Sequence, residues 1–193
     1  MKIGYQGIEG SYSHQASLKF IKNLKYEDVQ LVPLITSQNV VDSLRKNKIT
    51  YGIMAIQNNT TGTVEETREA IMNQDIKCIH KIILPIQHCL YKKKNVTNKE
   101  LKQVASHKQA LKQTEMVRKL KYKELQEIEL EDTALGANEL NNNILHNTTA
   151  VICSQIAGEL YHLELVDKDL NDNQDNKTTF GVFINNSKKK CEK

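Results

Sequence analysis

The chain of 193 residues carries 27 lysines and arginines against 23 aspartates and glutamates, a formal net charge of +4, and 39% of its residues are hydrophobic. This length suits one ordinary domain or two small lobes, and the apolar content can bury a core, which excludes a wholly disordered chain. Only three of the cations are arginines, Arg45, Arg68 and Arg118. Nucleic-acid binding favours arginine forks gathered in one patch, so the basic charge does not predict a nucleic-acid partner.

Cysteine usage and hydropathy indicate the compartment. The four cysteines lie far apart without a C-x-x-C pair, which predicts free thiols in a reducing environment: Cys78, Cys89, Cys153 and Cys191. No apolar run approaches the roughly 20 residues that span a bilayer, and the first residues lack the apolar segment of a secretory signal. We therefore expect a cytoplasmic protein without a membrane partner.

The first part of the chain alternates short apolar runs with amphipathic segments. We expect strands over 2–5, 29–34 and 51–56, and helices over 13–24, from Ser37 or Asn39 through Leu44, and over 64–72. This order, strand then helix three times over, favours a largely parallel sheet flanked by helices.

The second part repeats this order after an apolar crossover from Ile76 to Leu90 that contains Pro85. We expect strands over 103–105, 125–130 and 150–153, helices over 109–120, 133–140 and 154–160, and a last strand over 178–184. The extra strand suggests that the chain returns to the first lobe. We therefore predict a first lobe of residues 1–82 and 167–193, and an inserted second lobe of residues 83–166.

Five strand-to-helix junctions are rich in small hydroxyl and amide residues: 7–13, 57–63, 106–109, 131–134 and 153–155. In parallel α/β sheets such junctions lie at the carboxyl edge, where ligands bind, and helix N-termini attract carboxylates or phosphates. Helix capping uses the same residue types and is the better explanation for any one junction. The run from Asn58 to Thr63 holds more polar groups than one cap requires.

The sequence lacks the motifs of nucleotide-binding, serine hydrolase and zinc sites. The glycines Gly7 and Gly10 do not have dinucleotide-loop spacing, no Walker lysine follows a glycine run, and no G-x-S-x-G elbow is present. His88 and Cys89 would point to opposite faces of a strand, which argues against a zinc site. We expect no metal and no cofactor. His107 is the histidine that the pattern places at a ligand-binding edge, with a structural histidine as the alternative.

Taken together, the junctions resemble the catalytic domain of prephenate dehydratase. Residues 7–13 look like G-P-E-G-S/T-F/Y-S, residues 51–60 like Y-G-V-V-P-I-E-N-S-T, and residues 106–111 like S-H-P-Q-A-L. Thr133-Ala134 matches part of S-T-A, residues 154–161 resemble A-x-x-A-A-x-x-Y, and residues 176–180 fall on N-x-T-R-F. The six motifs occur in the family's order along residues 2–184.

This resemblance implies two interleaved α/β lobes with a cleft between them, an architecture like that of type II periplasmic binding proteins. It also implies conversion of prephenate to phenylpyruvate, a step towards phenylalanine, without a cofactor. Thr178 would be the proton donor. Substrate-binding roles would pass to Ser11, Asn58, Thr60, Thr61, Ser106, His107, Gln109, Thr133, Lys177, Thr179 and Phe180.

The chain departs from the family pattern at several positions. Thr179 replaces the arginine of T-R-F, which removes a fork suited to a carboxylate, and Lys177 on the same strand face is a candidate replacement. Gln57, Lys108 and Asp132 replace a glutamate, a proline and a serine. Two alternatives therefore stay open beside prephenate dehydration: an arogenate dehydratase, whose substrate amine suits an acidic contact such as Asp132, and a binding module that has lost turnover.

The family normally continues into a regulatory ACT domain that senses phenylalanine, and no such domain is expected within these 193 residues. The resemblance also implies a homodimer.

Overall fold

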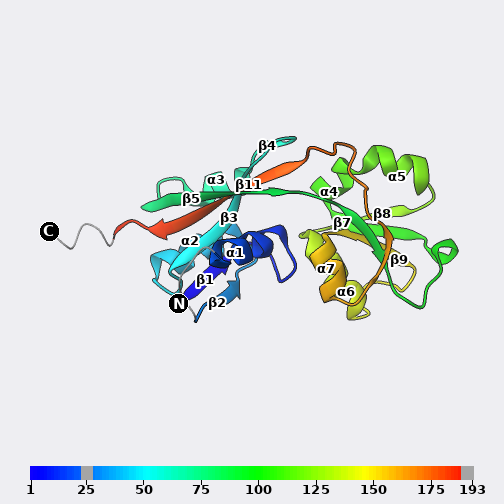
Figure 1. Cartoon of the computed structure of the whole chain (residues 1–193), viewed down its shortest axis with the longest axis horizontal. Coiled ribbons are helices and arrows are strands. Elements are labelled where there is room, and N and C mark those ends of the chain that lie inside the picture. The colour runs from blue at the N-terminus through cyan, green and yellow to red at the C-terminus, as the bar shows by residue number, and fades with distance from the viewer. Residues whose placement is uncertain (23–27, 188–193) are drawn as a thin grey trace. The chain divides into compact units, whose positions relative to one another are not determined.

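The computed structural model describes residues 1–22 and 28–187 (Figure 1). The chain divides into two compact units. The first comprises Met1–Ile8, Tyr12–Pro85 and the chain from Lys177 onward, and the second comprises Glu9–Ser11 and Ile86–Asn176. The expected lobe boundaries lay after residues 82 and 166, whereas the chain changes unit after Pro85 and after Asn176. The assignment of lobes stays a prediction.

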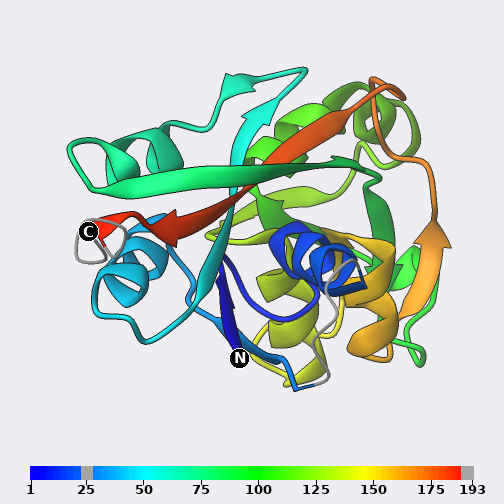
Figure 2. The same ribbon diagram turned by 60° about the vertical axis from the view of Figure 1, so that its left-hand side comes forward.

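The sheet of the first unit has the order β2-β1-β3-β11-β5, with β4 paired to β3 alone. Its strands are β1 (Lys2–Tyr5), β2 (Gln30–Pro33), β3 (Tyr51–Asn58), β4 (Gly62–Thr63), β5 (Ile76–Pro85) and β11 (Lys177–Asn185). β1 is parallel to β2 and β3, whereas β11 is antiparallel to both β3 and β5. Figure 2 shows β11, in orange and red, lying beside these two strands.

The predicted return of the last strand to the first sheet is therefore confirmed, and the expectation of a largely parallel sheet is wrong. The register explains the difference, because β11 begins beside the end of β3, where Thr178 pairs with Asn58, and then runs back along it.

Helices cover both faces of this sheet: α1 (Tyr12–Lys22) on one face, and α2 (Ser37–Arg45) and α3 (Glu65–Ile71) on the other. Consecutive side chains of a strand point to opposite faces, so Ile53 packs with the α1 residue Phe20, and Met54 packs with the α2 residue Val40. The hydroxyl of Thr36 caps α2 by accepting from Asn39 N at 3.2 Å. The sequence allowed Ser37 or Asn39 as the residue that caps this helix, and the structure shows that the cap is Thr36. Leu24, expected in the first helix, lies outside the described residues.

The second unit has a mixed sheet in the order β10-β6-β9-β7-β8. Its strands are β6 (Cys89–Lys92), β7 (Gln103–His107), β8 (Gln126–Leu130), β9 (Thr149–Cys153) and β10 (Glu164–Asp167). β7 is parallel to β8 and β9, and β6 is antiparallel to β9 and β10. The helices are α4 (Lys108–Gln113), α5 (Glu115–Lys121), α6 (Thr133–Asn141) and α7 (Gln155–Leu160), with a short 3-10 helix η1 (Asn98–Glu100).

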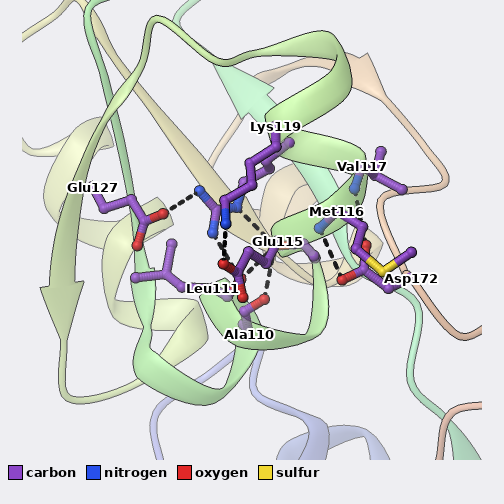
Figure 3. A network of polar contacts seen from close by, with 10 residues as sticks. Ala110, Leu111, Glu115, Met116, Val117, Lys119, Glu127 and Asp172 are labelled. Carbon is purple, nitrogen blue, oxygen red and sulfur yellow. Dashed lines mark hydrogen bonds and ion pairs between the residues drawn. The ribbon is translucent and has the colours of Figure 1, made fainter.

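The predicted helix over 109–120 is two helices, α4 and α5, separated at Thr114. The first backbone amides of α5 have no acceptor within the helix and donate instead to the Asp172 carboxylate, Met116 N at 3.0 Å and Val117 N at 2.9 Å (Figure 3). The buried Arg118 joins the two helices by donating to Leu111 O at 2.8 Å and to Thr114 Oγ1 at 3.0 Å. A distant loop residue, Asp172, thus supplies the cap that begins a new helix.

Three cysteines within the described residues, Cys78, Cys89 and Cys153, are free thiols. Burial raises the pKa of Cys89 to about 11 and raises that of Cys153 further, which keeps both thiols protonated and poorly nucleophilic. No helix in the described part of the chain combines the length and apolar character that a membrane crossing demands.

Candidate active site

The start of β11 places Thr178 beside Asn58, the last residue of β3. Both side chains are buried, with 8% of Thr178 and 3% of Asn58 exposed. Asn58 Nδ2 donates a hydrogen bond of 2.8 Å to Thr178 Oγ1. Because Thr178 Oγ1 is the acceptor in this contact, its own proton is available for donation to a third group.

The orientation of the Asn58 amide is set by its other contacts. Asn58 Oδ1 accepts from Thr60 N at 2.9 Å and from Thr61 N at 3.0 Å. Backbone N–H groups can only donate, so the oxygen must face them and the NH₂ group must face Thr178. The segment 57–63, expected to join a strand to a helix, is therefore a β-hairpin turn between β3 and β4 that is closed by Asn58. The side chains of Thr60 and Thr61 are exposed.

Residues around Thr178 alternate along β11. Lys177 is exposed, Thr179 is half-buried on the same face, and Phe180 is 2% exposed inside the core against α1. Lys177 is fixed at its backbone, because Lys177 N donates to Asn59 Oδ1 at 2.7 Å and Asn59 N donates to Lys177 O at 3.0 Å. Asn59, which sequence reasoning did not single out, thus ties the start of β11 to the end of β3.

In the second unit, the carboxyl end of β7 presents His107 at the start of α4. His107 Nδ1 accepts from Gln109 N at 3.2 Å and caps the helix. A neutral ring whose Nδ1 is an acceptor carries its proton on Nε2, so His107 offers a fixed N–H donor. The preceding Ser106 is fully buried and donates to Ile152 O at 2.6 Å, which is a structural contact between β7 and β9.

Asp132 and Thr133 lie at the start of α6, next to the end of β8. Asp132 Oδ1 accepts from Ala134 N at 2.6 Å and from Leu135 N at 3.2 Å. Burial raises the pKa of the Asp132 carboxyl, against the lowering effects of these hydrogen bonds and of the nearby His107 ring. Asp132 and His107 are therefore electrostatic neighbours at the carboxyl edge of β7 and β8. Sequence reasoning identified Asp132 as a departure but missed this pairing.

The glycine-rich segment that carries Ser11 is anchored on α7. Ser154 Oγ donates to Gly10 O at 2.9 Å while capping α7, and Tyr161 OH donates to Glu9 O at 3.1 Å. Gly10 has φ of +89°, and a Cβ there would lie 3.0 Å from Ala157, so this position requires glycine. Ser11 itself is 4% exposed.

The structure thus gathers the predicted residues into two sets, one in each unit. Asn58, Thr60, Thr61, Lys177, Thr178 and Thr179 belong to the first unit, and Ser11, His107, Gln109 and Thr133 belong to the second. Ser106 and Phe180 are buried in structural positions, and the roles of all these residues stay predictions. No cluster of potential metal ligands occurs in residues 1–22 and 28–187. The groups of these two sets that are exposed or half-buried are hydroxyls, an amide, an imidazole and a lysine, which suit carboxylate binding and proton donation.

Solved structures show the same fold. A prephenate dehydratase from Arthrobacter aurescens, in complex with L-Phe, matches 95% of this chain and 60% of its own with a TM-score of 0.82 and 20% identity. A periplasmic substrate-binding protein from Coxiella burnetii matches 98% of this chain and 86% of its own with a TM-score of 0.54 and 14% identity. The predicted α/β architecture, like that of periplasmic binding proteins, is confirmed.

Sequence comparison gives the family. The chain is 27% identical over 180 residues to arogenate dehydratase/prephenate dehydratase 2 of Arabidopsis thaliana, covering 93% of this chain and 45% of that protein. It is 27% identical over 184 residues to the bifunctional chorismate mutase/prephenate dehydratase of Aquifex aeolicus, covering 95% and 48%. The chain thus spans about half the length of these curated relatives. The family model for prephenate dehydratase matches residues 3–188, and the chain therefore belongs to the prephenate dehydratase family.

Proposed function

We propose that the chain catalyses the decarboxylating dehydration of prephenate, or of its amino counterpart arogenate, in phenylalanine biosynthesis. The observation that carries this proposal is the buried contact from Asn58 Nδ2 to Thr178 Oγ1. It provides a hydroxyl whose proton is directed away from its neighbour, on the strand where the family pattern has its threonine.

The reaction breaks two bonds that join substituents to the cyclohexadiene ring, the C–C bond to the ring carboxylate and the C–O bond to the hydroxyl. The ring carboxylate leaves as carbon dioxide, its bonding electrons complete the aromatic ring, and the ring hydroxyl leaves as water after gaining one proton. In the proposed mechanism Thr178 donates that proton and recovers one from solvent. The Asn58 N–H stabilises the negative charge that develops on Thr178 Oγ1, because a preorganised donor is strongest in a buried site.

The remaining exposed groups are proposed to hold the two substrate carboxylates. Lys177 offers a cation, Thr60 and Thr61 offer hydroxyls, and His107 offers its Nε2 proton. Gln109 and Thr133 add neutral donors beside His107 at the starts of α4 and α6. Neutral donors around the single cation of Lys177 suit a dianionic substrate whose product must also be released.

The replacement of the family's arginine by Thr179 supports a second candidate, a small-ligand binding module without turnover. Incubation with prephenate or arogenate distinguishes the two, with phenylpyruvate followed by its absorbance in alkali and phenylalanine by chromatography. An enzyme shows turnover that Thr178→Val lowers by about 10²-fold or more. If neither compound is converted while an aromatic amino acid raises the melting temperature, the binding module is correct.

A further inference from the structure

The carboxylate of Asp132 has one oxygen engaged in the fold and the other available. Asp132 Oδ1 accepts both amides that cap α6, at 2.6 and 3.2 Å. In the part of the chain that the structure describes, no hydrogen bond or ion pair engages Oδ2. A carboxylate can accept about four hydrogen bonds, so Asp132 retains unused acceptor capacity.

Capping alone does not require an acidic residue here. Serine, asparagine and aspartate cap helices about equally well, and a partly buried carboxylate carries a desolvation penalty that serine does not. The helix dipole offsets some of that penalty. The negative charge at Asp132 is therefore more than the local fold needs.

The neighbours of Asp132 indicate what this charge would recognise. His107 contributes a fixed Nε2–H donor at the end of β7, which pairs with the end of β8 just before Asp132. Thr133 adds a half-buried hydroxyl. An acceptor and donors set side by side match an α-amino acid group, in which an ammonium and a carboxylate share one carbon. A 2-keto acid would instead direct a carbonyl oxygen towards the carboxylate, which is repulsive.

We propose that Asp132 is a specificity residue that makes this site prefer arogenate, which bears an ammonium, over prephenate, which bears a keto group. This inference rests on the proposed function, because it assigns Asp132 to the same substrate. The preference comes from one charge-assisted hydrogen bond between the ammonium and Asp132 Oδ2 and from the repulsion of the keto oxygen.

The test compares kcat/KM for arogenate and prephenate in the unaltered protein, Asp132→Asn and Asp132→Ser. Both variants keep an oxygen that caps α6, so they remove the charge and leave the helix start intact. We expect arogenate to be preferred at least tenfold, and the ratio to fall about 10- to 100-fold in both variants, as for loss of one charged hydrogen bond. An unchanged ratio, or an equal loss for both substrates, overturns the proposal and leaves Asp132 as a cap.

A binding measurement separates this inference from the proposed function. Calorimetry with the products, L-phenylalanine and phenylpyruvate, reports amine selectivity without turnover. If neither substrate is converted but L-phenylalanine binds more tightly than phenylpyruvate and Asp132→Asn removes the difference, the function is wrong and the amine site stands. If both substrates are converted with no preference, the function stands and the amine site is wrong. If no substrate is converted and no product binds, both the proposed function and the amine site are wrong.

Discussion

Asn58→Asp tests the proposed chemistry with a change of one atom. The carboxylate is the same shape as the amide and keeps an oxygen for Thr60 N and Thr61 N, at 2.9 and 3.0 Å in the native protein. Its second oxygen, however, replaces the Nδ2 donor that lies 2.8 Å from Thr178 Oγ1. Two acceptors cannot share a hydrogen bond, so Thr178 must rotate its proton towards the introduced carboxylate to keep the contact.

This rotation removes the proposed proton donor and leaves the fold largely intact. Thr178 still makes one hydrogen bond, so the stability lost through this contact is small, and the chief cost is desolvation of the new carboxylate at a position that is 3% exposed. The loss in kcat should be that of a general acid, about 10²- to 10⁴-fold. At about 1.4 kcal/mol per tenfold, a 10²-fold loss is about 3 kcal/mol of activation free energy.

The assay measures kcat at substrate saturation for Asn58→Asp, Thr178→Val, the double variant and Thr178→Ser. Thr178→Val should lose about as much as Asn58→Asp, and the double variant should lose no more than either, because the residues act as one unit. Thr178→Ser, which keeps the hydroxyl, is the matched control and should retain most of the activity. A folded Asn58→Asp protein with native kcat, or losses that multiply in the double variant, would refute the proposed relay.

Three other predictions concern binding and stability. Lys177→Ala should raise KM about tenfold or more with little change in kcat, and Thr179→Arg should lower KM by restoring a carboxylate fork, as steady-state kinetics on both variants will show. Asp172→Ala should lower the free energy of unfolding by about 1 kcal/mol in urea titrations because it uncaps α5, and Asp172→Asn, which keeps one of the two acceptor oxygens, should lose only part of this stability. Burial lowers the pKa of His88 below 6.5, so at acidic pH the unfolded chain binds a proton more readily than the folded chain, and stability should fall as the pH drops below about 6.5. Urea titrations at several pH values measure this fall, and it should be smaller in His88→Gln. A His88→Gln protein whose urea midpoint changes with pH as in the native protein would contradict this.

The sequence predicts strands and helices well where the apolar pattern is clear. The segments 2–5 and 133–140 match β1 and most of α6, because β1 is a short apolar run buried at three consecutive residues and the buried residues of α6 follow the period of a helix. Local pattern fails where a distant residue decides the outcome. The pattern of residues 109–120 predicts one helix, whereas α4 ends at Gln113 and the carboxylate of Asp172, more than fifty residues away from Val117, caps the start of α5.

The sequence identifies which residues belong to the candidate site better than it predicts what each of them does there. Asn58 stood out as part of a polar run, but its function as a clamp on Thr178 depends on the pairing of β3 with β11, which brings together residues 120 positions apart. Ser106 also stood out, yet its hydroxyl holds β9 through Ile152. A sequence motif therefore identifies a hydroxyl residue at a position, but it does not show whether that hydroxyl contacts substrate or joins two strands.

The missing arginine at Thr179 and the retained Thr178 belong to different faces of the same strand, and this separates their consequences. Thr178 is buried against Asn58, whereas Lys177 and Thr179 lie on the other, more exposed face. A substitution at Thr179 therefore leaves the Asn58–Thr178 contact in place and changes only the charge offered on the opposite face. If residue 179 binds substrate as in the proposed function, loss of that arginine should weaken substrate binding and spare the proton donor, so we expect a weak affinity with a normal kcat.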